Sequence, residues 1–529
     1  MAYVSVVLAL VAVAAFALWR VFRFWRFTRK LDVVSGPPAY FILGNILQFK
    51  WGPEHWFDQA VGVASMFNSA RMARIWLFHR GYLMLFGPEE CEVLLGTAAQ
   101  NSAEKGHEYD MIRPWMGDGV FLSKGSKWRF RRKLLTPAFH YDILKDFVYI
   151  FNEHSRVFAS VLWRRQLSEM DLVPATTSCA LDTICHTAMG TMLHAQTEAA
   201  DSQYVEAVHK VTNMVHKRMK QPWLTDDTLF YLFGEGREFN RCVKIARDFS
   251  RKVIAERRQY VKAHGGVDKL MSQDADKRRK LVFLDLLLGM EERGDLDEEG
   301  IIEEVSTFMF AGHDTTGTAI NWLFFLLGNH PDVQLKVQQE LDGLFGDSDR
   351  EPTWQDLSEM RYLECCIREQ LRVLPSAPLL TRIMSQDTTF KNGFVAPAGT
   401  IALLNVYMIH RDPRHWDDPE TFRPERFLAE NQKGRHPYAF VPFSVGSRNC
   451  LGQRFAIMEM KCIVSAVLRY MTVRSVLRED QVRKTAELVM KSLDGIRVVL
   501  TPRRQLPPDV IKLAEGTTMP AKSQESSSH

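Results

Sequence analysis

Cysteine is scarce in this chain, and the eight cysteines among its 529 residues show no paired pattern. Cys365 and Cys366 are adjacent, and the others are spread thinly. This usage argues against a disulfide-stapled extracellular scaffold and suits a reducing compartment. An excess of charge is also missing, since the formal net charge is only +4. A general nucleic-acid binder would be far more basic, so we expect no nucleic-acid partner.

Internal repeats and long low-complexity linkers are absent as well, so nothing in the sequence divides the chain into obvious domains. Most of it is typical of helix, and 46% of the residues are hydrophobic, enough for a large core. Residues 71–86 alternate in a way that predicts a small sheet. Residues 263–280 are charged and predict an exposed connector. We therefore expect a mainly α fold with a minor β region.

The N-terminus carries an uncharged apolar run over residues 3–19, marginally long enough to cross a bilayer, which takes about 20 residues. Small residues near its end leave a cleaved signal peptide as the alternative. Basic residues follow the run and none precedes it: Arg20, Arg23, Arg26, Arg29 and Lys30. Because basic flanks stay in the cytosol, we expect a retained transmembrane anchor over residues 1–20. A basic, proline-rich linker then covers residues 21–40.

The most specific segment covers residues 443–452, with the sequence FSVGSRNCLG. Its glycines, including Gly446, allow the backbone to approach a flat group closely. Arg448 places a cation two residues before Cys450, whose thiolate form would bind metal. For a lone cysteine, a buried structural role is the alternative. From Phe443 onward, however, the whole segment resembles the cysteine loop of the cytochromes P450.

That resemblance implies heme b, with Cys450 as the axial ligand of the heme iron. It also implies the cytochrome P450 fold, as a single large heme-binding domain over residues 41–503. Proline, lysine, serine and glutamine dominate the rest of the chain, so we expect a disordered tail over residues 504–529.

A polar patch interrupts an apolar helix expected over residues 301–327. Glycine and paired threonines weaken or divert a helical hydrogen-bond ladder. A kinked core helix with satisfied hydroxyls is the structural alternative. The patch resembles the oxygen-activating groove of the cytochromes P450, which places Ala311 and Gly312 beside the heme. On that resemblance Thr315 would hydrogen-bond the bound dioxygen, and Asp314 would relay protons from solvent.

Glu369 and Arg372 lie three residues apart, on one face of an expected helix. Such pairs are usually exposed, but apolar neighbours here suggest burial, where both charges need partners. The pair resembles the family's Glu-x-x-Arg motif, which joins an arginine further along the chain. The segment 421–427 supplies that residue, with Arg423 as the expected third member. The role would be structural, holding the cysteine loop.

Trp128 and Arg132 lie four apart on one face of a basic run over residues 128–133. A solvated face or a nucleic-acid patch would be the alternative. The two residues resemble the family's contacts to the heme propionates, and Arg382 and Arg448 resemble further propionate partners. Arginine suits carboxylates because its fork donates two parallel hydrogen bonds.

The remaining basic residues of this run are expected to face outward: Arg129, Arg131 and Lys133. In the family this surface meets an acidic electron donor, and complementary charge speeds docking.

Further segments, including residues 133–140, 283–287 and 436–443, resemble the fatty-acid-hydroxylase branch of the family, family 4. The resemblance extends from about residue 36 to about residue 502. Many members of that branch carry a glutamate that forms an ester with a heme methyl group, and here that position is Ala311. Alanine cannot form the ester, so we expect non-covalent heme. Strict attack at terminal carbons is then less expected than in-chain hydroxylation or epoxidation.

The resemblance implies a membrane-bound monooxygenase that inserts one oxygen atom from O2 into a fatty acid or similar lipophile. Electrons would come from NADPH through cytochrome P450 reductase, with cytochrome b5 as a further partner, at the endoplasmic reticulum membrane. Two alternatives stay open: a heme-thiolate isomerase or dehydratase that needs no external electrons, and a heme sensor or carrier without turnover.

Overall fold

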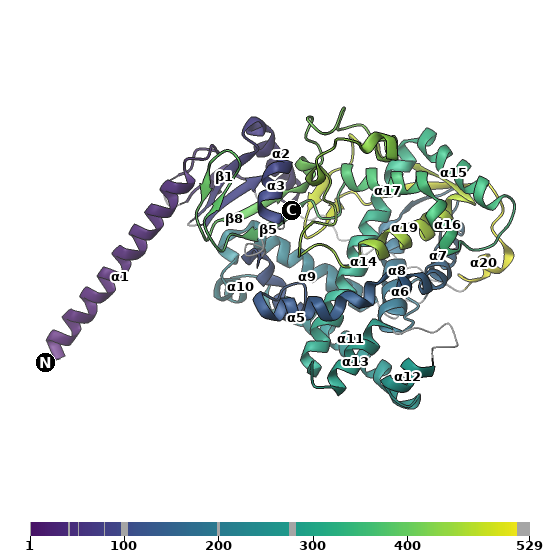
Figure 1. Cartoon of the computed structure of the whole chain (residues 1–529), viewed down its shortest axis with the longest axis horizontal. Helices are drawn as coiled ribbons and strands as arrows, with labels where there is room; N and C mark the ends of the chain where they lie inside the picture. Colours follow the sequence, from purple (N-terminus) through teal and green to yellow (C-terminus); the bar gives the residue numbers. More distant parts are fainter. Residues whose placement is uncertain are drawn as a thin grey trace. The chain divides into compact units, whose positions relative to one another are not determined.

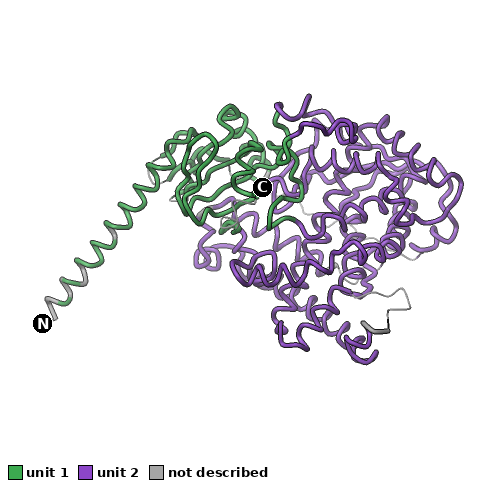
Figure 2. The backbone as a smooth tube through the Cα atoms, viewed as in Figure 1, with its two compact units in different colours: residues 1–108, 379–412, 436–449 green, residues 109–378, 413–435, 450–529 purple. Residues whose placement is uncertain are grey.

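The computed structural model describes residues 2–40, 43–50, 52–78, 80–96, 104–197, 202–273 and 282–515. The chain divides into two compact units, each assembled from separate stretches of sequence (Figure 2). Unit 1 contains residues 1–108, 379–412 and 436–449, and unit 2 contains residues 109–378, 413–435 and 450–529. The single domain predicted over residues 41–503 includes residues of both units.

Unit 1 is organised by a five-stranded sheet in the order β1-β2-β8-β5-β3, with β2 and β8 parallel and the other pairs antiparallel. Successive side chains of a strand point to opposite faces, and two cores result. Trp76 and Leu83 belong to one core, Ile75 and Met84 to the other. Strands β1 and β2 confirm the small sheet predicted over residues 71–86.

The elements of unit 1 are as follows: α1 (Ala2–Leu31), α2 (Pro53–Met66), β1 (Met72–Leu77), β2 (Arg80–Leu85), α3 (Pro88–Leu95), β3 (Glu104–Lys105), β5 (Leu379–Ile383), β6 (Thr388–Thr389), β7 (Val395–Ala396), β8 (Ile401–Asn405) and α18 (Val406–Ile409). Short 3-10 turns lie at Ile46–Gln48, Asn68–Ala70 and Pro437–Ala439.

Helix α1 is continuous from Ala2 to Leu31, so the first part of the predicted linker is helical. Arginines stack on its aromatic rings, with Arg29 4.1 Å from the ring centre of Trp25 and Arg23 4.9 Å from that of Trp19. In the part of the chain that the structure describes, no helix combines the length and the apolar character needed to cross a membrane. The transmembrane anchor predicted at residues 1–20 is therefore not found.

Unit 2 is mainly helical, and its central element is α14 (Glu298–Asn329), which contacts α8, α11, α17 and α19 (Figure 1). The Asp297 side chain caps this helix by accepting from the Gly300 N–H at 2.9 Å. Where α8 crosses α14, the Thr176 hydroxyl donates to the Asn321 side-chain oxygen at 2.8 Å. Such bonds satisfy polar groups that would be costly to bury alone.

The helices of unit 2 are α4 (Arg113–Met116), α5 (Gly125–Leu135), α6 (Tyr141–Asp146), α7 (Val148–Trp163), α8 (Val173–Ile184), α9 (Ser202–Lys220), α10 (Asp227–Phe233), α11 (Gly236–Ala263), α12 (Val267–Gln273), α13 (Phe283–Glu292), α14, α15 (Pro331–Phe345), α16 (Trp354–Glu359), α17 (Arg361–Val373), α19 (Gln453–Leu468) and α20 (Pro508–Lys512). Its strands are β4 (Glu169–Asp171), β9 (Met471–Ser475), β10 (Lys484–Ala486), β11 (Met490–Ser492) and β12 (Arg497–Pro502).

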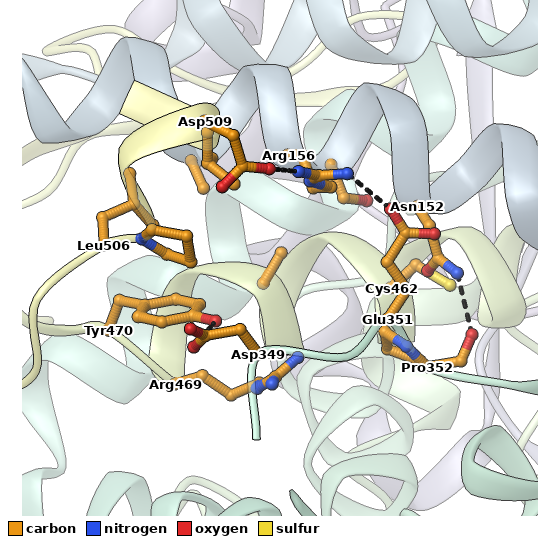
Figure 3. A pocket seen from close by; sticks show the side chains of 15 residues that line it. Asn152, Arg156, Asp349, Glu351, Pro352, Cys462, Arg469, Tyr470, Leu506 and Asp509 are labelled. Carbon is orange, nitrogen blue, oxygen red and sulfur yellow. Dashed lines mark hydrogen bonds and ion pairs between the residues drawn. The ribbon is translucent and has the colours of Figure 1, made fainter. Parts of the chain in front are cut away.

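The predicted connector over residues 263–280 contains the helix α12, and residues 274–281 lie outside the described part. The predicted tail is ordered at its start. Helix α20 sits over α7, where Arg156 pairs with Asp509 and, at 2.8 Å, with Glu351 (Figure 3). These contacts line a small cavity of about 70 Å³, and within the predicted tail residues 508–512 form a helix.

Candidate active site

The buried part of α14 opens to its surroundings near its middle. From residue 301 to residue 327 every residue is buried except Ala311, Gly312 and Thr315. Residues four and three apart share a face of a helix, so these three form a single narrow window. The Thr315 hydroxyl donates to the Ala311 carbonyl at 2.6 Å. The expected diversion of the hydrogen-bond ladder is thus a side-chain bond within an unbroken helix.

Asp314 lies behind this window. Its side chain is buried, with 7% of the residue exposed, and its Oδ2 has no hydrogen-bond partner. A buried carboxylate without complete hydrogen bonding is expensive, so its position next to an exposed hydroxyl is a feature to explain. The hydroxyl and the carboxylate predicted to act together are adjacent in sequence but face different surroundings.

Cys450 is the accessible cysteine of the chain. The other seven cysteines are buried, and burial raises the pKa of several of them, including Cys179 and Cys366. Only a thiolate ligates metal, so these buried thiols are poor ligands. Cys450 is exposed, three residues before α19 begins.

Helix α5 brings a cation towards this sulfur. Burial lowers the pKa of Arg132, and the charge of Cys450 acts on it in the opposite direction. The two groups therefore interact electrostatically within unit 2. Trp128, on the same face of α5, is half-buried like Arg132. A guanidinium here could serve a thiolate or the carboxylates of a bound group.

Unit 1 carries the other predicted cofactor residues. Arg382 lies on β5, is 1% exposed and donates to the Thr381 carbonyl at 2.9 Å. Gly446 has a φ of 77°, and a Cβ atom there would lie 2.2 Å from the Leu95 carbonyl oxygen. Only glycine fits that turn. Phe443 and Arg448, at either side of it, are half-buried.

The predicted outward face of α5 needs one correction. Arg129 and Lys133 are exposed as expected, but Arg131 is buried. Its guanidinium lies 3.1 Å from Glu304 and 3.4 Å from Glu303, both at the start of α14. Glu304 also accepts from the Val120 N–H at 3.0 Å. Arg131 therefore ties α5 to α14 and is not available to an electron donor.

The predicted Glu-x-x-Arg pair is present. Glu369 and Arg372 are fully buried and form two parallel hydrogen bonds of 2.7 and 2.8 Å. The third member, however, is Arg426 and not Arg423. The Arg426 guanidinium is buried 3.3 Å from Glu369, whereas Arg423 is exposed and contributes only its backbone N–H, at 2.9 Å.

Arg426 could have been found from its setting. It lies in a tight turn between Pro424 and Phe427, both buried, and an arginine next to buried apolar residues is a candidate for burial itself. Two further charged residues, both half-buried, gave no sequence signal. Lys491 and Glu487 belong to the β10–β11 hairpin, where Lys491 Nζ lies 2.9 Å from Glu487 Oε2.

The residues fit a heme. An accessible thiol accompanied by an arginine suits an iron ligand, and a narrow window of small side chains on α14 suits a flat group. A heme-thiolate oxygenase needs both features, a cysteine to ligate the iron and room for the flat heme.

Comparisons with known proteins agree. The family model for cytochrome P450 matches residues 34–496. Cytochrome P450 4c3 of Drosophila melanogaster is 40% identical over 484 residues, which cover 89% of this chain and 90% of that protein. Cytochrome P450 4V2 of Mus musculus is 42% identical over 473 residues, covering 88% and 89%. The chain therefore belongs to the cytochrome P450 family, and its relatives lie in family 4.

A solved structure supports the fold. The crystal structure of the cytochrome P450DA heme domain superposes with a TM-score of 0.76 at 21% identity, covering 92% of this chain and 99% of that one. Membership of the family makes the protein a cytochrome P450 monooxygenase with a heme iron cofactor.

Proposed function

We propose that Cys450 would ligate the heme iron and that the α14 window would line the heme site. The observation that carries this proposal is the burial pattern of α14, which exposes Ala311, Gly312 and Thr315 and hides every neighbour. Heme iron, when bound, supplies the reductive activation of O2, helped by electron donation from the thiolate. Trp128, Arg132, Arg382 and Arg448 would hold the propionates.

Thr315 is suited to pass a proton on. Its hydroxyl hydrogen is engaged by the Ala311 carbonyl at 2.6 Å, so its oxygen lone pairs can accept a hydrogen bond from the open side. Rotation about one bond would let the hydroxyl donate there instead. Asp314, one residue earlier and buried, would resupply protons in a site kept dry.

The experiment is to measure how much of the NADPH consumed appears as oxygenated product in the reconstituted enzyme. For Thr315→Ala we expect product per NADPH to fall by on the order of tenfold or more, the lower range of a lost proton-transfer group. The amount of hydrogen peroxide released per NADPH should rise correspondingly. Thr315→Ser is the matched control, because it keeps the hydroxyl and should retain most of the coupling. Full coupling in Thr315→Ala would refute the assignment.

The substrate is proposed to be a fatty acid or a similar lipophile, on the strength of the family 4 relatives. Hydroxylation within the chain, or epoxidation, is expected because Ala311 offers no carboxylate for an ester with the heme. Substrate-induced spectral shifts with a panel of fatty acids, sterols and terpenoids, followed by product analysis, would identify it.

Non-covalent heme is a separate prediction. Treating the protein with acidic organic solvent should extract essentially all of the heme, since Ala311 carries no nucleophilic oxygen. The matched variant is Ala311→Glu, which introduces the carboxylate and should retain part of the heme after turnover. Heme that stays on the wild-type protein would contradict the prediction.

Electrons are proposed to come from NADPH through cytochrome P450 reductase, with cytochrome b5 as an additional donor. The exposed Arg129 and Lys133 suit an acidic partner surface. Product formation that needs no reductase would indicate an isomerase or dehydratase instead. Location at the endoplasmic reticulum remains a prediction from the sequence, and co-sedimentation of the expressed protein with microsomes tests it.

A further inference from the structure

The segment that leads into Cys450 starts from a turn in unit 1. Residues 436–449 belong to this unit, and Cys450 follows them directly along the chain. Val441 is buried in the same core as Ile409. The Val441 carbonyl accepts from the Ser444 N–H at 3.0 Å, and Ser444 has a φ of 56°, which is uncommon for a residue with a side chain. Val441 is therefore the base from which the loop that carries Cys450 begins.

The N–H of Val441 donates to a histidine side chain. Its acceptor is Nε2 of His410 at 2.8 Å, 31 positions earlier in the chain. Both residues are buried, with 0% of His410 and 1% of Val441 exposed. His410 itself ends α18, since its backbone N–H donates to the Val406 carbonyl at 3.0 Å. The bond therefore joins the end of β8 and α18 to the base of the Cys450 loop.

This hydrogen bond adds direction to the packing around Val441. Apolar contacts are non-directional, so they hold the segment without fixing its rotation. A hydrogen bond needs its donor and acceptor in line, so the imidazole of His410 fixes the orientation of the Val441 peptide group. Because Nε2 accepts, the ring is neutral and carries its proton on Nδ1. If the imidazole were removed, a buried N–H would lose its acceptor, which is costly.

The loop beyond Val441 has little slack. Its turn at Gly446 lies so close to the Leu95 carbonyl that an added Cβ atom would be 2.2 Å from the oxygen. The Asn449 N–H then donates to the Gly446 carbonyl at 3.2 Å, one residue before Cys450. A short loop held at these points cannot absorb a shift of its base, so a displacement of Val441 would reach the sulfur.

We propose that His410 is a positioning residue for Cys450, because it accepts the Val441 N–H and so fixes the base of the cysteine loop. This inference rests on the proposed role of Cys450 as the ligand of the heme iron. With the bond in place, the loop presents the sulfur in one position. Without it, the loop samples other positions, and the sulfur is lost from the iron more readily.

The test measures the ferrous carbon monoxide spectrum of the full-length holoenzyme, which shows how much of the heme keeps its thiolate ligand. For His410→Leu we expect the ratio of heme without the thiolate to heme with it to rise by about tenfold or more, as for a buried N–H that loses its acceptor. His410→Gln keeps an oxygen acceptor at a similar reach and should restore most of the thiolate band.

Two control variants separate this bond from its surroundings. His436 Nδ1 accepts from the Tyr438 N–H at 3.2 Å, only two positions away, and its side chain is 22% exposed, so water can replace it. His436→Leu should therefore have the spectrum of the wild type. Ile409→Ala removes buried apolar packing next to His410 and lowers stability, but should keep the wild-type ratio. An equal rise in Ile409→Ala would mean general destabilisation and would overturn the proposal.

Amide hydrogen exchange gives a readout that does not depend on the heme spectrum. In the wild-type holoenzyme the Val441 amide should exchange slowly, because it is buried and hydrogen-bonded. In His410→Leu it should exchange faster, and in His410→Gln slowly again, while the amides of β8 stay protected in all three proteins. If His410→Leu does not incorporate heme, the wild type alone decides: a Val441 amide that exchanges as fast as exposed amides would overturn the proposal.

The outcomes separate the two proposals. If Cys450→Ala keeps the thiolate band, the proposed role of Cys450 is wrong. If Cys450→Ala loses the band while His410→Leu has the wild-type ratio, the inference about His410 alone is overturned. A loss of the band in His410→Leu that His410→Gln reverses and that His436→Leu does not share supports the inference.

Discussion

Two buried charged clusters in unit 2 differ in how completely they are satisfied. Around Glu369, two guanidinium N–H groups, a backbone N–H and a second guanidinium occupy the carboxylate, and Arg372 donates further to the carbonyls of residues 419 and 421. Around Asp314, one carboxylate oxygen has no hydrogen bond. Both oxygens of Glu369 accept hydrogen bonds, whereas Asp314 keeps one oxygen without a hydrogen bond next to the α14 window.

This difference distinguishes a structural role of a buried carboxylate from a chemical one. A fully bonded buried ion pair cannot change its protonation state without breaking several bonds at once, so it holds segments together. A carboxylate oxygen without a hydrogen bond, as at Asp314, can take part in a new hydrogen bond without breaking an existing one. Buried carboxylates on α17 and on α14 therefore differ, since the one on α17 is bonded at both oxygens and the one on α14 is not.

The largest expected loss of stability comes from breaking the Glu369 cluster. Arg426→Ala leaves Glu369 short of a charge partner, and we expect a loss of about 3 kcal/mol or more in unfolding free energy, as for other broken buried pairs. Heme incorporation should fall with it. Arg423→Ala is the matched control, since its exposed side chain lies outside the cluster, and its cost should stay below about 0.5 kcal/mol. Chemical denaturation measures both, and equal losses would contradict the corrected assignment.

A smaller effect on stability is expected at Glu304, where burial outweighs the ion pair. Burial raises the pKa of Glu304 from 4.5 to about 7, against the opposing influence of the Val120 N–H and Arg131. The folded protein then binds a proton more tightly than the unfolded chain between these two values. Stability from this group is therefore present at low pH and is lost as pH rises from about 4.5 to about 7.

Glu304→Gln should remove this dependence. The variant should become more stable relative to the wild type as pH rises from 5 to 7, and its melting temperature should rise relative to that of the wild type. The gain in unfolding free energy should be at most about 3 kcal/mol. Thermal melts at several pH values measure it. Parallel curves for the two proteins over that range would show that Glu304 ionises normally.

The sequence could predict those parts of the site whose residues lie close together along the chain. Three features each lie within one short stretch of sequence, so their residues share a loop or a helix face by geometry alone. They are the Cys450 segment, the α14 patch and the Glu369–Arg372 pair. Arg131 could also have been placed correctly. Residues 129 and 133 share a face of α5, whereas residue 131 lies about 200° around the helix from 129.

The rest depended on distant contacts. Arg423 and Arg426 lie in one irregular stretch of chain, where no helical or strand period tells which arginine points inward. The β10–β11 hairpin folds back onto α14, where the Trp322 indole N–H donates to the Met490 carbonyl across 168 positions of the sequence. The helix α1 continues to Leu31 and α20 forms within residues 504–529, two stretches whose basic, proline-rich or polar composition predicted a linker and a tail.

The most direct test of the central claim is the ferrous carbon monoxide difference spectrum of Cys450→Ala, with Cys462→Ala as the control. Cys462 is buried twelve residues further along, in α19, and burial raises the pKa of its thiol, so it should not ligate iron. We predict that Cys462→Ala keeps the red-shifted Soret band of thiolate-ligated heme and that Cys450→Ala loses it. A normal thiolate band in Cys450→Ala would show that another residue holds the iron.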